Sequence, residues 1–190
     1  MKLAFITGAT KGIGRSTAIT FANAGWDLIL LSRDLEMMET LRDELSDTKS
    51  TINLVKCDLS DENEIEEFVK ESINKYGCPS VLINNAGTAF NKNLVETTLK
   101  EWKEIIQINL TSVFQICSLI VPQMRKNGGL IINVSSHASY NAFPQWGAYC
   151  VSKSALAMFT KCLREEERPH SIRACTITLG SVNTPLRDSD

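Results

Sequence analysis

The sequence predicts an α/β protein with a doubly wound parallel sheet. Short apolar runs alternate with longer stretches in which apolar residues recur at helical spacing. The runs are apolar on both faces, as expected of strands in a parallel sheet that helices cover on both sides. A glycine-rich turn joins the first run to the first helical stretch, which is the usual place of a nucleotide-binding loop.

The N-terminal half of the chain is predicted to alternate three strands with three helices. Apolar runs predict strands at residues 3–6, 27–31 and 51–56. Helical spacing of apolar residues predicts helices at residues 13–24, 35–45 and 62–76. Gly25 and Gly77 follow the first and third helical stretches, where a residue with left-handed backbone angles commonly ends a helix.

The C-terminal half continues the alternation. Apolar runs predict strands at residues 81–83, 130–134 and 172–179. Helices are predicted at residues 99–124, broken into two, and at residues 148–163. Thr98 and Glu101 fit a capping box at the start of the long helical stretch. We find no internal repeat or linker, so residues 1–190 are predicted to form one domain.

Composition narrows the classes of partner. The net charge is −2 and basic residues form no cluster, which argues against a nucleic-acid partner. Met1 and Lys2 lead directly into the first strand, so we expect no signal or spanning segment, no membrane partner and a cytoplasmic protein. Six cysteines without a Cys-x-x-Cys pair predict reduced thiols, and two histidines are too few for an obvious zinc site, so no metal is expected.

The turn after the first strand carries glycines in a G-x-x-x-G-x-G spacing. Glycine lets the backbone approach a pyrophosphate closely, and the N-terminus of the following helix favours the anion. A plain tight turn is the alternative, but a strand before it and a helix after it favour dinucleotide binding. The residues expected to bind are Gly8, Thr10, Lys11, Gly12, Ile13 and Gly14.

Tyr149 and Lys153 are four residues apart on a predicted helix, so an ammonium can lie close to a phenol on one helical face. An unperturbed tyrosine ionises near pH ~10, so action at neutral pH requires roughly 4 kcal/mol of preferential phenolate stabilisation. A nearby cation acts in that direction. An accidental surface pair is the alternative for this spacing taken alone.

These motifs resemble the short-chain dehydrogenase/reductase family, which has the Rossmann fold and a Tyr-x-x-x-Lys signature preceded by a strand-end serine. The family spacing selects Ser136 rather than Ser135. The resemblance implies hydride transfer between NADP(H) and a carbonyl or secondary alcohol. Ser136 would bond the oxyanion, Tyr149 would donate the proton, and Lys153 would lower the tyrosine pKa and hold the nicotinamide ribose. Asn109 would be the fourth catalytic residue, linking Lys153 to solvent through a water, unless it is only a satisfied buried amide.

The cofactor preference is expected to depend on the end of the second strand. An acidic residue there would bind the free ribose of NAD(H), whereas this chain has Ser32 and Arg33. Arg33 and Lys11 can pair with the extra phosphate of NADP(H), which we therefore favour over NAD(H). Asp34 would weaken or reverse this preference if it faced the ribose instead of Ser32. The alternative for Arg33 is a solvated charge near the helix start.

Other cofactor contacts are implied by the resemblance alone. Asp58 and Leu59 match the adenine-contacting positions of the family. In the Asn-Asn-Ala-Gly motif at residues 84–87, Asn84 is the cofactor candidate and Asn85 the residue that braces the sheet, and the motif's contacts extend to Ala86 and Gly87. A segment near the nicotinamide matches with Leu179 in place of proline, and its candidate residues are Gly180, Val182 and Thr184.

The sequence ends before the length that members of this family usually have. Relatives continue with a substrate loop, a helix and a seventh strand, so we expect either a tail missing from this sequence or an incomplete enzyme. Aromatic residues between Ser136 and Tyr149 are expected to line a substrate pocket, to pack as core or to lie at a subunit contact. A homodimer or homotetramer is implied by resemblance. A nucleotide-binding scaffold without turnover is the main alternative, while a methyltransferase would leave the serine, tyrosine and lysine unexplained.

Overall fold

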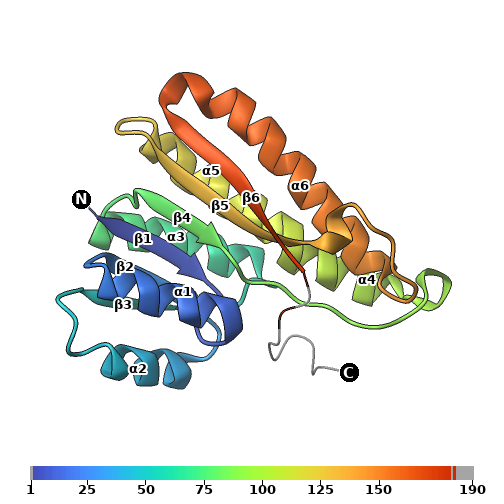
Figure 1. The fold of residues 1–190 in the computed structure, drawn as a ribbon, viewed down its shortest axis with the longest axis horizontal. Coiled ribbons are helices and arrows are strands. Elements are labelled where there is room, and N and C mark those ends of the chain that lie inside the picture. The colour runs from blue at the N-terminus through green and yellow to red at the C-terminus, as the bar shows by residue number, and fades with distance from the viewer. Residues whose placement is uncertain (1, 181, 183–190) are drawn as a thin grey trace.

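The computed structural model describes residues 2–180 and 182, and its centre is a six-stranded parallel sheet (Figure 1). The spatial order of the strands is β3-β2-β1-β4-β5-β6. Each strand overlaps its predicted run, so the predicted fold class is confirmed. The strands are β1 (Leu3–Thr7), β2 (Asp27–Ser32), β3 (Ile52–Lys56), β4 (Val81–Asn84), β5 (Gly129–Ser136) and β6 (Ile172–Leu179).

The helices of the described residues also match the predicted stretches. A π-helical turn, η2 (Gln107–Thr111), interrupts the long stretch as expected and joins α4 to α5. The α-helices are α1 (Gly12–Asn23), α2 (Leu35–Glu44), α3 (Glu62–Tyr76), α4 (Leu99–Ile106), α5 (Ser112–Met124) and α6 (Gly147–Glu167). The short 3-10 turns are η1 (Leu94–Glu96), η3 (His137–Ser139) and η4 (Arg168–His170).

Side-chain caps explain where several helices begin. The Thr98 hydroxyl accepts a hydrogen bond from the Glu101 amide at 3.3 Å, and the Glu101 carboxylate accepts one from the Thr98 amide at 2.8 Å. This is the predicted capping box. The Asp61 carboxylate caps α3 by accepting hydrogen bonds from the Asn63 and Glu64 amides. Asp34 caps α2 by accepting a hydrogen bond from the Met37 amide at 3.0 Å.

Helices cover both faces of the sheet, as Figure 1 shows. On one face α3, α5 and α6 pack against the strands in a core that includes Phe5, Ile65 and Ile116. On the other face α1 and α2 form a second core that includes Ile6 and Leu41. Because the consecutive residues Phe5 and Ile6 belong to different cores, β1 has to be apolar on both of its faces.

The order of the strands determines where a ligand site can form. From β1 the chain builds β2 and β3 on one side, then crosses to build β4, β5 and β6 on the other. The turn after β1 and the loop after β4 therefore leave the carboxyl ends of two adjacent strands in opposite directions. Ligands of open α/β sheets bind in the crevice at such a switch point.

Candidate active site

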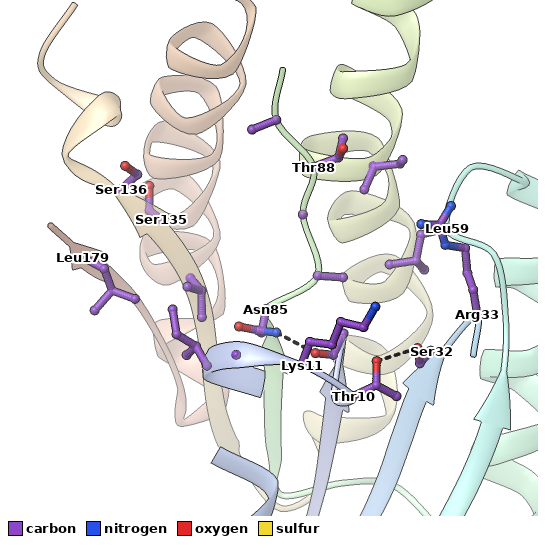
Figure 2. Close-up of a pocket in the computed structure, with 18 of the residues that line it drawn as sticks. Thr10, Lys11, Ser32, Arg33, Leu59, Asn85, Thr88, Ser135, Ser136 and Leu179 are labelled. Carbon is purple, nitrogen blue, oxygen red and sulfur yellow. Dashed lines mark hydrogen bonds between the residues drawn. The ribbon is translucent and has the colours of Figure 1, made fainter. Parts of the chain in front are cut away.

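A large cavity lies at the carboxyl edge of the sheet and contains most of the predicted site residues (Figure 2). Its volume of about 1350 Å³ exceeds the roughly 300–1,000 Å³ that is usual for a site holding one small ligand. In Figure 2, Ser135, Ser136 and Leu179 lie toward one end, and Lys11 and Arg33 lie toward the other. The cavity thus has room for a dinucleotide with a second molecule at one end.

The glycine turn is held in place by the loop after β4. The Asn85 side-chain amide donates to the carbonyls of Thr7 and Gly8 at 3.1 and 3.0 Å. Gly8 has φ +64°, and a Cβ there would lie 2.8 Å from the Ala86 Cα. At Gly14 a Cβ would lie 2.1 Å from the Gly8 carbonyl oxygen. Only glycine allows these close approaches, so the turn is preformed.

Gly14 supports the turn from behind and does not line the cavity, whereas the other five predicted residues of the turn line it. Direct cofactor contact of Gly14 stays a prediction, and the structure gives this residue a packing role. Its missing side chain is used against Gly8 and Asn85, where a Cβ would also come within 2.4 Å of the Asn85 side-chain nitrogen. The role of Gly14 is therefore to let α1 begin close to the turn.

Asn84, the expected cofactor contact, does not line the cavity. It is 2% exposed, and its side-chain nitrogen donates to the Asn133 side-chain oxygen at 2.8 Å. Asn85, expected only to brace the sheet, does so and also lines the cavity. Successive side chains of a strand point to opposite faces, so Asn84 points into the core beside α5 and α6.

Two cations lie near the end of β2. Arg33 and Lys11 both line the cavity, and the guanidinium of Arg33 lies 3.9 Å from the Asp58 carboxylate. The hydroxyls of Thr10 and Ser32 are 3.2 Å apart, shown by the dashed line in Figure 2. Carboxylates lie at this end as well: Asp34 caps α2, and Asp58 lies beside Arg33, so the two cations and the two hydroxyls are the groups that can meet an anion favourably.

Ser136 and Tyr149 meet at the opposite end of the cavity. Ser136 ends β5, and its hydroxyl accepts a hydrogen bond from the Ala138 amide at 3.2 Å. Tyr149 lies in the first turn of α6. Burial raises the pKa of Tyr149 above its ordinary value of 10.0, although a hydrogen bond with Ser136 acts in the opposite direction. The Ser135 hydroxyl is buried and has no hydrogen-bond partner among the described residues.

Lys153 is buried below Tyr149. Its ammonium donates to the Val134 carbonyl at 2.9 Å and lies 5.7 Å from the centre of the Tyr149 ring. Burial lowers the pKa of Lys153 from 10.5 to about 8. The sequence predicted that this lysine would lower the pKa of Tyr149, but in the structure burial of the phenol outweighs any such effect. Burial favours the neutral form of both groups.

Asn109 lies in the π-helical turn η2 and is fully buried. Its side-chain oxygen accepts a hydrogen bond from the Thr88 amide at 2.8 Å, and its nitrogen donates to the Thr88 carbonyl at 2.8 Å. A Cβ on Gly87 would lie 3.2 Å from the Asn109 oxygen and 3.5 Å from the Lys153 ammonium. Asn109 and Lys153 therefore both lie close to Gly87, although Asn109 itself does not line the cavity.

The wall around Ser136 and Tyr149 is mostly apolar. His137, Phe143, Trp146, Leu179 and Val182 line it. The rings of Trp146 and Tyr149 pack edge to face with centroids 5.7 Å apart. Gly180 also lines the cavity beneath the His137 ring, while Thr184 lies outside the described residues.

Several lining residues carry no chemical signal in the sequence. Ala86 and Gly87 line the cavity as predicted, as do Asp58 and Leu59. Thr88, Ala89 and Ile108 line it as well but were not predicted. For Thr88 the available signal was its place directly after the Asn-Asn-Ala-Gly motif. Ala89 and Ile108 are apolar residues whose exposure to a cavity depends on how the loop and the π-helical turn are packed.

One stretch, Leu99–Met124, is long and apolar enough to cross a membrane, with a mean hydropathy of 1.6. Half of this window is buried inside the protein, and the core helices of soluble proteins pass the same test, so this observation is weak support for a membrane span. Among residues 2–180 and 182, no group of three or more His, Cys, Asp or Glu side chains is placed to hold a metal ion.

Comparison with curated proteins gives relatives across nearly the whole chain. The 3-oxoacyl-(acyl-carrier-protein) reductase of Thermotoga maritima is 31% identical over 188 residues, which are 98% of this chain and 76% of the relative. The 3β-hydroxysteroid dehydrogenase of Mediterraneibacter gnavus is 32% identical over 188 residues, which are 98% of this chain and 68% of the relative.

Solved structures share the fold at similar identity. The Brucella melitensis 3-ketoacyl-(acyl-carrier-protein) reductase complexed with NADH has a TM-score of 0.92 and 27% identity, over 99% of this chain and 79% of that one. The Thermococcus sibiricus alcohol dehydrogenase complexed with 5-hydroxy-NADP has a TM-score of 0.88 and 29% identity, over 96% of this chain and 77% of that one.

The family model described as short chain dehydrogenase matches residues 2–190. This match agrees with the named relatives, which are reductases and dehydrogenases, and with the observed sheet. The chain therefore belongs to the short-chain dehydrogenase family of oxidoreductases.

Proposed function

We propose that this protein is a single dinucleotide-binding domain that transfers a hydride between NADP(H) and a carbonyl or secondary alcohol. The observation that carries the proposal is that Ser136, Tyr149 and Lys153 line the same cavity as the glycine turn. A hydroxyl, a phenol and an ammonium around one point suit the protonation and stabilisation of a substrate oxygen.

When bound, a reduced nicotinamide would supply the hydride for the carbonyl carbon. Ser136 donates a hydrogen bond to the carbonyl oxygen, and Tyr149 gives its proton to that oxygen as negative charge develops. Lys153 would hold the ribose hydroxyls of the cofactor and stabilise the tyrosinate that remains. Asn109, fixed in the π-helical turn, positions a water through which Lys153 exchanges protons with solvent.

The preference for NADP(H) over NAD(H) rests on charge. Arg33 and Lys11 line the ribose end of the cavity, and Asp34 is occupied by its role as a helix cap. A phosphate there would meet two cations, whereas the Asp34 carboxylate that could bind a free ribose is held as the cap of α2. One of the structures described above was solved with an NADP derivative and another with NADH, so membership of the family does not decide the preference.

The substrate is proposed to be a small carbonyl compound with an apolar body. Phe143 and Trp146 line the wall near Tyr149, and Phe143 is 45% exposed, so apolar surface is available to a ligand. The relatives named above act on an acyl chain and on a steroid, which share an apolar body beside the reacting oxygen.

We also propose a cytoplasmic homodimer or homotetramer without nucleic-acid or membrane partners. Phe114 on α5 and Val151 and Met158 on α6 are exposed apolar side chains, which suit contact with a second copy of the chain. Sedimentation of the wild type and of a Phe114→Glu/Met158→Glu variant tests this, since only an interface through these helices predicts dissociation of the variant.

Two measurements test the function. Fluorescence titration with NADPH and with NADH measures binding, and a panel of aldehydes and ketones measures NADPH oxidation. We expect NADPH to bind more tightly than NADH, and at least one carbonyl to be reduced by the wild type but not by Tyr149→Phe. Binding without turnover across the panel, on the longest available form of the chain, would favour the nucleotide-binding scaffold instead.

A further inference from the structure

Ser152 joins the turn of α6 that carries Tyr149 and Lys153 to the π-helical turn η2. Ser152 is completely buried. Its hydroxyl donates to the Tyr149 carbonyl at 2.8 Å and accepts a hydrogen bond from the Asn109 side-chain nitrogen at 3.0 Å. The hydroxyl therefore has one bond on each of two elements that are adjacent in space but separated by 43 residues along the chain.

Each end of this link is close to a group of the proposed mechanism. In an α-helix the Tyr149 carbonyl also accepts the backbone N–H of Lys153, so the carbonyl belongs to the turn that carries both side chains. At the other end, Asn109 grips the Thr88 amide and carbonyl, and Thr88 lines the cavity. Ser152 thus completes a chain of hydrogen bonds from Thr88 through Asn109 to the helical turn of Tyr149 and Lys153.

We propose that Ser152 is a positioning residue, which holds the turn carrying Tyr149 and Lys153 at a fixed distance from Asn109 and the Thr88 loop. The catalytic consequence rests on the proposed function. A phenol that has to reach one substrate oxygen tolerates little displacement, and a misplacement of about 1 Å can cost roughly 100-fold in rate. Ser152 does not line the cavity, so its effect on ligand binding should be small.

The same helix supplies a matched control. Thr160 on α6 is 2% exposed, its hydroxyl donates to the Leu156 carbonyl at 2.7 Å, and it accepts from the Asn133 side-chain nitrogen at 2.8 Å. This is the same arrangement as at Ser152: a buried hydroxyl between an asparagine amide and a helical carbonyl. Thr160 lies outside the cavity, so its loss should affect stability without affecting the position of Tyr149.

The first experiment compares Ser152→Ala with Thr160→Val in NADPH-dependent reduction of a carbonyl that the wild type accepts. We expect kcat of Ser152→Ala to fall about tenfold while KM for NADPH stays within about twofold. For Thr160→Val we expect both constants to remain at the wild-type values, although both variants unfold at a lower urea concentration. Equal kcat in the two variants would overturn the proposal.

The second experiment does not depend on turnover. Hydrogen exchange of the Thr88 amide, followed by NMR, reports whether Asn109 still holds the loop. We expect exchange at Thr88 to quicken in Ser152→Ala beyond the change seen at core amides, and not in Thr160→Val. Unchanged exchange at Thr88 would overturn the coupling, whereas absence of carbonyl reduction by the wild type would overturn only the proposed function. Ser152→Cys, which preserves size with a weaker hydrogen-bonding group, serves if the alanine variant does not fold.

Discussion

Replacing Lys153 by methionine is expected to stabilise the protein at neutral pH, although it removes a residue of the proposed active site. Lys153 is 4% exposed, and burial lowers the pKa of its ammonium from 10.5 to about 8. At about 1.4 kcal/mol per pKa unit, keeping this group charged at neutral pH costs about 3 kcal/mol. Loss of the hydrogen bond from this ammonium to the Val134 carbonyl gives back about 2 kcal/mol, so the expected net gain is about 1 kcal/mol.

The gain should depend on pH with a defined sign. The pKa of Lys153 is lower in the folded state, so the unfolded state binds more protons between about pH 8 and pH 10.5. The free energy of unfolding of the wild type therefore rises with pH through this window, relative to a variant without the lysine. Below about pH 8 the difference in free energy of unfolding that favours Lys153→Met is constant. This difference falls as the pH rises further and reaches zero before pH 10.5.

Urea unfolding of the wild type and Lys153→Met, followed by the fluorescence of the three tryptophans, measures this difference at a series of pH values. Lys161→Met, at an exposed position of the same helix, is the control and should change stability by no more than about 0.5 kcal/mol. The reasoning fails if Lys153→Met is no more stable than the wild type at pH 7, or if its advantage does not change between pH 7 and pH 9.5.

Three further results are expected. Tyr149→Phe should lower carbonyl reduction about 10²–10⁴-fold, and an unchanged NADPH dissociation constant would separate this loss of proton transfer from misfolding. Lys11→Ala combined with Arg33→Ala should weaken NADPH binding at least about tenfold and NADH binding much less; an equal loss for both cofactors would contradict phosphate recognition by these cations. Thr98→Ala should lower the free energy of unfolding by about 1 kcal/mol through loss of the capping box, with kcat unchanged, and a urea midpoint equal to that of the wild type would exclude a stabilising cap.

The fold was predictable because its signals are local. Apolar periodicity located the strands and helices, and Thr98 with Glu101 located the start of α4 to the residue. The glycine turn and the Asn-Asn-Ala-Gly loop were each recognisable within a few residues. Their contact across β1 and β4 follows from the parallel order of the strands. Most of the predicted cofactor residues accordingly line one cavity.

The details that sequence reasoning missed depend on which way a side chain points and on how deeply it is buried. Asn84 and Asn85 are chemically identical neighbours, and only their alternation at the end of β4 sends the first into the core and the second toward Gly8. The charge states of Tyr149 and Lys153 depend on burial, which is a property of the packed structure. Ser152 has ordinary helical surroundings in the sequence, and its partner Asn109 is identified only by the folded chain.

The raised pKa of Tyr149 has a consequence for the direction of the reaction. In the proposed mechanism Tyr149 has to be protonated to donate a proton to a carbonyl; a phenol is protonated at neutral pH, and burial raises its pKa further. Alcohol oxidation needs the tyrosinate instead, so its rate should rise with pH and reach no plateau below pH 9, while carbonyl reduction is already at its plateau near pH 7. Initial rates in both directions across this range measure the difference. A plateau of alcohol oxidation at pH 7 would mean that the cation of Lys153, with the cofactor bound, outweighs the burial of the phenol.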